Sequence, residues 1–493
     1  MQSLCGSLWS EAVTKTISKI LSSAKNKWMG TTPGWQVQRA DGKNPIQIGV
    51  VGAGPAGIFA ARAIQRRLPG AEITIMGDPT NAQPRTISCG TVTFDVATVF
   101  LHVGYENSIQ PLLDEFGFHL DDAQNTPLSQ ISLDLGPWSI RLRRSMMVAY
   151  LFLHRCLWIL LARQFPSLYA QSVKRYLTRW GLGQLMQSTG FLWVVTAQGY
   201  GWLSDVAVDR FFEWCDPAML WSMCMRGILP GFQGTYKIRE GYGTLFRRAY
   251  ETVVAKKIPN CQVVSVTPSR RTHGESCVAV ATQDGQCFLF DQVVLACDFS
   301  RLRSTPLHTT LLTNRDVDID VTWFGSWAFR TNRPLCNFAQ NAIRVLQSER
   351  RNVPTSIGLR GIDHSGGDVP KYIYWGVFYA SSSQFPLESL EQEIRQNYDD
   401  HTLVGLPPLT ITTEYSHVYE YNVRPSMVSL AAGFRTSLSA MQGTGGVWYT
   451  GGLCSHWDVD SIYEATESIV EELAQTIRCS DVPKHTESER PSE

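Results

Sequence analysis

The spacing of apolar residues changes its period close to the start of the chain. Residues 46–51, IQIGVV, form a short apolar run rich in β-branched side chains, which is typical of a buried strand. Residues 58–64 are rich in alanine and are followed by Arg66 and Arg67, a pattern that indicates a helix. A second apolar run, AEITIM at residues 71–76, predicts another strand. The order strand, helix, strand predicts a βαβ unit in this part of the chain.

Three glycines lie at the turn between the first strand and the helix. Gly52 permits the tight turn, Gly54 leaves room for a pyrophosphate beside the backbone, and Gly57 lets the helix pack closely on the strand. A phosphate at this turn would face free N–H groups at the positive end of the helix dipole. The pattern therefore predicts a dinucleotide site. A glycine-rich turn in another kind of α/β protein is the alternative interpretation.

The end of the second predicted strand departs from this pattern. An acidic side chain normally stands there and binds the ribose hydroxyls of the nucleotide. In this chain Gly77 occupies that position and Asp78 follows it. The acid has therefore either moved by one residue, to Asp78, or been lost.

Length and composition indicate a two-domain globular protein. The chain has 493 residues, of which 44% are hydrophobic and 18% are charged, so it can bury a large core. Lys plus Arg and Asp plus Glu both number 44, so the net charge does not favour a nucleic-acid partner. The twelve cysteines include no CxxC pair, and the chain has no N-x-S/T sequon. These features predict reduced thiols, no metal site and a cytoplasmic location.

Two segments raise the question of contact with a membrane. Residues 3–25 could form a basic amphipathic helix at a membrane surface, although a helix packed on its own domain or a loosely ordered leader is the favoured interpretation. Residues 145–162 are strongly apolar, but His154 and Arg155 lie in their middle. Because a charge at the centre of a bilayer costs at least ~2.5 kcal/mol, a spanning helix is disfavoured. We expect a buried helix that lines an apolar pocket, with peripheral insertion at a membrane interface as the alternative.

Three later segments add further strands and helices. Residues 84–118 begin with PRT and continue through short apolar runs. Residues 239–297 indicate a glycine turn, an amphipathic helix and several strands, the last being QVVLAC. Residues 441–473 indicate a strand, a Gly-Gly turn and a helix that Asp458 could cap.

Together with the glycine turn, these segments resemble the flavin-containing amine oxidase and phytoene-desaturase-like superfamily, discontinuously from about residue 46 to residue 473. The resemblance implies an α/β fold in which FAD lies across a Rossmann-like domain assembled from three discontinuous segments, with an α+β substrate domain over the flavin ring. The expected boundaries are a leader at 1–45, an FAD-binding domain at 46–105, 231–305 and 426–478, a substrate domain at 106–230 and 306–425, and a disordered tail at 479–493.

The resemblance also implies which residues contact the cofactor phosphates. The pyrophosphate loop corresponds to Gly52, Gly54, Ala56 and Gly57. Arg85 matches the arginine of the family's GGRT motif, which contacts the phosphates. Gln83 and Pro84 replace the paired glycines of that motif, but backbone amides still supply most of the phosphate contacts.

The adenine and the flavin of the cofactor are expected to contact two further segments. Val263 matches a valine whose backbone meets the adenine, and Gly451 matches the glycine whose strand and following helix carry the flavin. Gly452 stands where an acidic residue commonly binds the ribityl chain. The backbone amides of Val459 and Asp460, at the start of the following helix, could stabilise negative charge near flavin N1.

Catalytic candidates are harder to name from the sequence. His456 and Asp458 lie closest in the sequence to the predicted flavin edge and are the candidate acid or base. A packed imidazole and a simple helix cap are equally good interpretations of these two residues.

The resemblance implies an FAD-dependent oxidoreductase that oxidises or desaturates a hydrophobic small molecule, as a tailoring step in specialised metabolism. A flavin-dependent isomerase or cyclase and a non-enzymatic protein resembling the GDP-dissociation inhibitors are the alternatives. The chain contains no second dinucleotide fingerprint after a strand. We therefore expect molecular oxygen or another diffusible electron acceptor.

Overall fold

The computed structural model describes most of the chain between the predicted leader and the predicted tail. The described residues are 45–81, 85–96, 101–102, 105, 108–122, 138–162, 164–183, 201–215, 235–271, 275–297, 318–335, 343–345, 350–365, 370–399, 407–455 and 459–480. The leader and the tail fall almost wholly outside these ranges.

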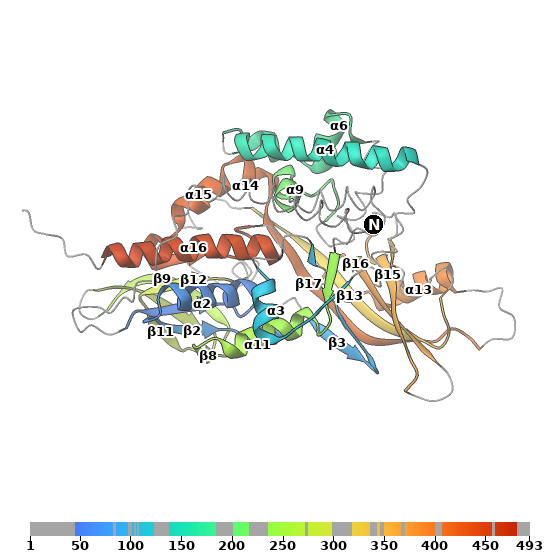
Figure 1. Cartoon of the computed structure of the whole chain (residues 1–493), viewed down its shortest axis with the longest axis horizontal. Coiled ribbons are helices and arrows are strands. Elements are labelled where there is room, and N and C mark those ends of the chain that lie inside the picture. Colours follow the sequence, from blue (N-terminus) through green and yellow to red (C-terminus); the bar gives the residue numbers. More distant parts are fainter. Residues whose placement is uncertain are drawn as a thin grey trace, which may run out of the picture.

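A five-stranded parallel sheet forms the centre of one domain (Figure 1). Its strands, in spatial order, are β18 (Val447–Tyr449), β12 (Gln292–Leu295), β1 (Gln47–Val51), β2 (Glu72–Met76) and β8 (Lys256–Ile258). They come from three separate stretches of the sequence. The predicted assembly of a Rossmann-like domain from discontinuous segments is therefore confirmed.

Helices cover one face of this sheet. They are α2 (Pro55–Arg67), α3 (Gln110–Phe116), α11 (Tyr242–Thr252) and α16 (Val459–Ser480). Because side chains alternate along a strand, Ile48 and Val50 of β1 both enter the core beneath these helices. The ring of Phe59 on α2 packs against two other helices of this layer. Its centre lies 5.5 Å from the ring centre of Phe246 on α11 and 5.1 Å from that of Tyr463 on α16.

A smaller antiparallel sheet covers the opposite face. It contains β9 (Val263–Arg270), β10 (Ser276–Thr282) and β11 (Cys287–Phe290). Val278 and Phe290 of this sheet share a buried cluster with Val51, Val293 and Leu295 of the parallel sheet. The domain therefore has three layers, with the parallel sheet in the middle.

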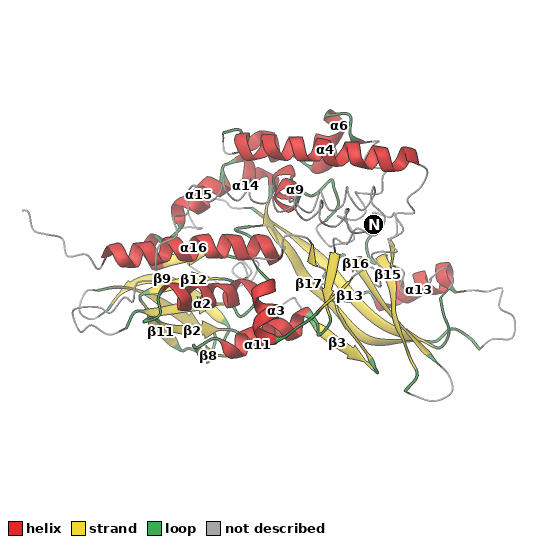
Figure 2. Ribbon diagram, in the orientation of Figure 1, coloured by secondary structure: helices red, strands yellow, loops and turns green. Residues whose placement is uncertain are grey.

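A long, twisted antiparallel sheet forms the second domain (Figure 2). Its order is β14 (Ile343–Val345), β15 (Pro354–Asp363), β16 (Lys371–Tyr379), β13 (Ile319–Thr331) and β17 (Ile411–Pro425). Helix α13 (Leu387–Tyr398) packs on one face through Leu390 and Ile394. The hairpin of β3 (Thr86–Cys89) and β4 (Val92–Asp95) packs on the other face through Phe94.

Helices outside these two domains form a third region, along the upper edge of the view in Figure 1. They are α4 (Trp138–Leu161), α5 (Pro166–Tyr169), α6 (Val173–Arg179), α9 (Val208–Trp214), α14 (Met427–Ala431) and α15 (Phe434–Met441). The remaining elements are β5 (Leu101–His102), β6 (Leu120–Asp122), β7 (Thr235–Ile238), η1 (Pro79–Asn81) and η4 (Thr444–Gly446). Among the described helices, none combines the length and the apolar character needed to cross a membrane.

Residues 145–162 form a helix, as predicted, but the prediction that this helix is buried is wrong for its outward side. Met147, Leu151 and His154 of α4 are buried against the helical core. Leu153 and Leu160, on the outward side, are 54% and 68% exposed. Apolar residues occur all around this helix, so their spacing could not indicate which side faces the core.

Candidate functional site

The candidate cofactor site lies at the carboxyl ends of the parallel strands. β1 is in the middle of the sheet and pairs with β2 on one side and β12 on the other. In open α/β sheets, ligands bind outside the carboxyl ends of the strands at the point where the strand order reverses. Gly52 and Gly77 directly follow β1 and β2 at this edge, and the Gly52 amide donates a hydrogen bond of 2.8 Å to the carbonyl oxygen of Met76.

The glycine turn has the geometry that a close phosphate contact requires. Gly52 has a φ of +114°, a conformation that favours glycine, and a Cβ there would stand 2.6 Å from the carbonyl oxygen of Ala296. A Cβ on Gly57 would stand 1.8 Å from the carbonyl oxygen of Gly52, so α2 packs directly on the turn. Gly54 is the N-terminal cap of α2 and provides no side-chain hydrogen bond to it. The first amides of α2 therefore face the turn without a side-chain cap.

The C-terminal segment meets the glycine turn at the first turn of α2. Gly451 has a φ of +102°, and a Cβ there would lie 3.7 Å from the Cβ of Ala56. α16 begins eight residues later at Val459, which is buried. The Asp460 carboxylate accepts a hydrogen bond from the hydroxyl of Ser108. Gly451 therefore lies beside the glycine turn. The Asp460 side chain is already hydrogen-bonded to another residue of the protein, Ser108.

The residue that follows Gly77 lies at the same edge of the sheet. Asp78 accepts a hydrogen bond of 2.8 Å from the backbone amide of Thr80, within the short turn η1. Burial raises the pKa of Tyr250, and the charge of Asp78 raises it further, so the two side chains lie near one another. Val263, the first residue of β9, is half-buried against the core cluster that contains Met76.

Arg85 lies near the second domain. Burial lowers the pKa of His417 on β17, and the charge of Arg85 lowers it further. The Nε atom of Arg85 is buried and has no hydrogen-bond partner. An unpartnered buried donor on a cation suits a ligand that carries negative charge.

An aromatic surface faces the hairpin that follows Arg85. We call this surface the aromatic face. Its residues alternate along three neighbouring strands: Phe324 on β13, Trp375 and Tyr379 on β16, and Tyr415, His417, Tyr419 and Tyr421 on β17. The rings of His417 and Tyr419 lie 4.3 Å apart, and the hydroxyls of Tyr415 and Tyr419 share a hydrogen bond. Burial raises the pKa of Tyr419, so this phenol stays neutral at physiological pH. The aromatic face can bind an apolar molecule beside one weakly basic imidazole.

The sequence interpretation missed this aromatic face. The alternation EYSHVYEY at residues 414–421 was the available signal, because residues two apart in a strand share a face. The neighbouring strands that complete the face are remote in sequence.

Two buried charges connect the hairpin to both domains. Asp95 accepts a hydrogen bond of 2.6 Å from the Thr86 hydroxyl, and both of its oxygens lie 3.0 Å from the Tyr242 amide at the start of α11, which donates to them. Burial raises the pKa of Asp95 to about 6, although these hydrogen bonds oppose the rise. Burial lowers the pKa of Arg360 to about 10, and its guanidinium lies 4.4 Å from the centre of the Trp375 ring. These charges fix the end of the hairpin that carries Arg85.

A third buried charge holds the loop after β18. Arg210 of α9 donates hydrogen bonds of 2.7 Å to the carbonyl oxygens of Leu453 and Ser455 and one of 2.9 Å to Glu213. Arg435 of α15 pairs with Glu213 at 2.7 Å. The helical region is therefore bonded directly to the loop that begins at Gly451.

The proposed acid and base cannot be located. His456 and Asp458 lie outside the described residues. No group of three or more His, Cys, Asp or Glu residues in the described part of the chain could hold a metal ion.

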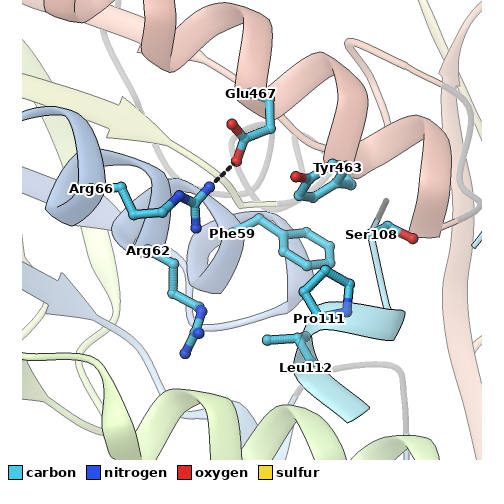
Figure 3. Close-up of a pocket in the computed structure, with 8 residues that line it drawn as sticks. All are labelled: Phe59, Arg62, Arg66, Ser108, Pro111, Leu112, Tyr463 and Glu467. Carbon is cyan, nitrogen blue, oxygen red and sulfur yellow. Dashed lines mark hydrogen bonds and ion pairs between the residues drawn. The ribbon is translucent and has the colours of Figure 1, made fainter. Parts of the chain in front are cut away.

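A small pocket lies elsewhere, between α2, α3 and α16 (Figure 3). Its volume is about 50 Å³, which is too small for a dinucleotide. Arg66 pairs with Glu467 at 2.5 Å, and Arg62 pairs with Glu115. Because both cations are already neutralised, we interpret this pocket as a gap where helices pack.

Comparison with known proteins identifies the fold. No protein-family model matches the sequence, and no curated protein matches it. Among solved structures, a CLA-producing fatty acid isomerase from P. acnes matches with a TM-score of 0.63 and 15% identity, over 87% of this chain and 99% of that one. A putrescine oxidase variant matches with a TM-score of 0.60 and 11% identity, over 88% of this chain and 99% of that one. A putative protoporphyrinogen oxidase from Exiguobacterium sp. 255-15 matches with a TM-score of 0.53 and 14% identity, over 88% of this chain and 100% of that one.

These similarities extend over 87–88% of this chain. The predicted resemblance to the flavin-containing amine oxidase superfamily is confirmed at the level of the fold. At 10–15% identity the similarities identify an architecture and do not identify a substrate.

Proposed function

We propose that this chain binds FAD and is a flavin-dependent oxidoreductase. The observation that carries the proposal is the glycine turn at the carboxyl end of β1, where Gly52 has a φ of +114° and Gly57 leaves no space for a Cβ. The residues around it suit a dinucleotide. The pyrophosphate would lie against the backbone amides of Gly54, Ala56 and Gly57, and the unpartnered Nε of Arg85 would donate to an anionic oxygen.

The remaining contacts follow the strands of the two sheets. Asp78 would bind the ribose of the adenosine, and the backbone of Val263 would meet the adenine. Gly451 lies beside Ala56, so its loop would pass along the ribityl side. The first amides of α16, at Val459 and Asp460, would stabilise negative charge on the ring.

The bound flavin would accept a hydride or electrons from the substrate. The aromatic face would orient an apolar substrate and exclude water from it. His417 has a pKa below its ordinary value because of burial and the nearby Arg85, so its imidazole is neutral and can accept a proton. His456 and Asp458 remain candidates for the same role.

The substrate that this arrangement favours is a hydrophobic small molecule, which would be oxidised or desaturated in a tailoring step of specialised metabolism. We expect molecular oxygen or another diffusible compound to reoxidise the flavin. Reduced thiols and the lack of a sequon support a cytoplasmic location.

An isomerase is the second candidate function. The fatty acid isomerase has a TM-score of 0.63, so this fold also serves a reaction named as an isomerisation. An isomerisation has no net need for an electron acceptor, and this property separates the two candidates. The GDP-dissociation-inhibitor alternative is less well supported, because the glycine turn keeps its phosphate geometry.

The proposal is tested with the purified protein. It should be yellow, and acid should release FAD from it. Gly54→Val should abolish flavin retention, because a branched side chain would fill the space for the pyrophosphate. Gly183→Val is the matched control, since a Cβ at Gly183 would make only ordinary contacts. A colourless wild-type protein that neither takes up FAD nor is stabilised by it would overturn the proposal.

Anaerobic mixing with lipophilic candidate substrates separates the two enzyme classes. Loss of the oxidised flavin absorbance identifies a redox substrate. Product formation while the flavin stays oxidised supports the isomerase instead.

A further inference from the structure

The outward side of α4 is an unusually apolar surface. Six of its exposed side chains are Met146, Phe152, Leu153, Leu157, Ile159 and Leu160. Phe165, just after α4, and Trp180, just after α6, are 54% and 47% exposed. We call these eight residues the α4 surface. Figure 1 shows α4 and α6 together along the outer edge of the molecule.

The exposed apolar residues are concentrated here. Among the described residues, the large hydrophobic side chains that are exposed elsewhere are Val254, Leu289, Leu387 and Val428. Single exposed apolar residues are normal, whereas a contiguous group on one helix marks an interaction site.

The polar residues in the middle of α4 point away from this surface. His154 is buried and hydrogen-bonds to the hydroxyl of Tyr176, and burial lowers the pKa of its imidazole. Arg155 is half-buried and donates a hydrogen bond to the carbonyl oxygen of Cys215. The two side chains that disfavour a spanning helix are therefore held by the protein, and the outward surface keeps its apolar character.

The segment that carries α4 and α6 has charged residues of one sign. Residues 135–204 contain eight Lys and Arg residues and no Asp or Glu, although the whole chain has a net charge of zero. Lys174, Arg175 and Arg179 of α6 are exposed. Arg141, Arg143 and Arg144 belong to the first turns of α4. An apolar surface with a basic surround matches a membrane interface that contains anionic lipids.

We propose that the α4 surface binds an anionic membrane, with α4 lying in the plane of the interface. Its apolar side chains enter the boundary between headgroups and acyl chains, and the basic residues contact lipid phosphates. A second copy of this chain is a poorer partner, because a symmetric contact would bring two basic surfaces together. The proposal does not depend on the flavin.

The test is co-sedimentation of the full-length protein with vesicles of phosphatidylcholine alone or with 30% phosphatidylglycerol. Binding should be at least tenfold stronger to the anionic vesicles and should weaken as the salt concentration rises. The double variant Leu153→Glu/Leu160→Glu should bind at least tenfold more weakly. Val254→Glu/Leu289→Glu, which changes two exposed apolar residues of the nucleotide domain, should bind like the wild type.

A second variant separates the electrostatic contribution to membrane binding from the apolar contribution. Lys174→Glu/Arg175→Glu/Arg179→Glu should lose the preference for anionic vesicles. Equal binding by the wild type and the Leu153→Glu/Leu160→Glu variant would overturn the proposal. It would also be overturned if analytical ultracentrifugation showed a dimer that this variant dissociates while vesicle binding is absent. Circular dichroism of each variant confirms that a loss of binding does not result from unfolding.

Discussion

The guanidinium of Arg210 donates a hydrogen bond of 2.7 Å to the carbonyl oxygen of Leu453, across 243 residues of sequence. The same group donates to Ser455 at 2.7 Å, so one side chain fixes two carbonyl groups of the loop that follows Gly451. Burial lowers the pKa of Arg210, whereas the charge of Glu213 raises it and helps to keep the side chain protonated. The helical region thereby sets the conformation of a loop in the proposed flavin site.

Arg210→Lys should weaken flavin binding while the fold is retained. A lysine keeps the charge beside Glu213 but cannot reach both carbonyl oxygens with the geometry of a guanidinium. A hydrogen bond to a charged group is worth about 1.5–3 kcal/mol, so the FAD dissociation constant should rise by roughly 10- to 100-fold. Titration of the apoprotein with FAD measures the change. Arg248→Lys, at an exposed position on α11, is the matched control and should leave the constant unchanged.

Gly57→Ala tests the contact between α2 and the glycine turn. The added Cβ would stand 1.8 Å from the carbonyl oxygen of Gly52, so α2 must move away from β1. Forced overpacking of this kind typically costs about 1–3 kcal/mol. We expect a lower midpoint temperature and loss of bound flavin, both measured on the purified protein. Gly183→Ala should change neither, and an unaffected Gly57→Ala protein would contradict the packing described here.

The local parts of the nucleotide domain could be predicted from the sequence because their signals are local. The change from β-branched residues 46–51 to the alanine-rich residues 58–64 occurs at Gly52, where β1 ends and α2 follows. The three segments of the FAD-binding domain, residues 46–105, 231–305 and 426–478, were predicted from the family resemblance. Each supplies at least one strand of the parallel sheet.

The missed features depend on tertiary pairing. Ser326 lies opposite His417 in the strand register, and no periodicity in either segment indicates this pairing. The hydrogen bonds from Arg210 to Leu453 and Ser455 likewise join segments that share no sequence pattern. For α4, the apolar residues all around the helix concealed which side would remain exposed.

Asp95→Asn should reveal a pH-dependent contribution to stability. The pKa of Asp95 is raised from 3.8 to about 6, mainly by burial, so the folded protein holds this proton more tightly than the unfolded chain. The resulting stability is complete below about pH 3.8 and is lost as the pH rises through about 6. Between pH 5 and pH 7.5, the midpoint temperature of the wild type should therefore fall by a few degrees relative to Asp95→Asn.

The control for this measurement is an exposed aspartate. A hydrogen bond from Thr282, helped by hydrogen bonds from Gln286, lowers the pKa of Asp284 and outweighs the opposing effect of burial. Asp284→Asn should consequently show no pH-dependent difference from the wild type over the same range. A constant difference between the wild type and Asp95→Asn would mean that the buried carboxyl titrates normally.

The relation between Arg85 and His417 gives the most direct test of the proposed proton acceptor. Burial lowers the pKa of His417, and the positive charge of Arg85 lowers it further. Arg85→Gln removes that charge and should raise the pKa of His417, whereas Arg85→Lys keeps the charge and should change it less. Nuclear magnetic resonance of histidine-labelled protein measures the titration without flavin, and the signal that disappears in His417→Gln gives the assignment.

The same imidazole should matter for turnover if it accepts a proton. His417→Gln should then slow flavin reduction by about 10² to 10⁴, and the loss should be greatest at a pH above the His417 pKa, where the wild-type imidazole is neutral. A mutation of a residue that only packs would change the rate equally at all pH values. If the flavin-loaded His417→Gln protein reacts at the wild-type rate, His417 has only a packing role, and His456 and Asp458 become the groups to replace.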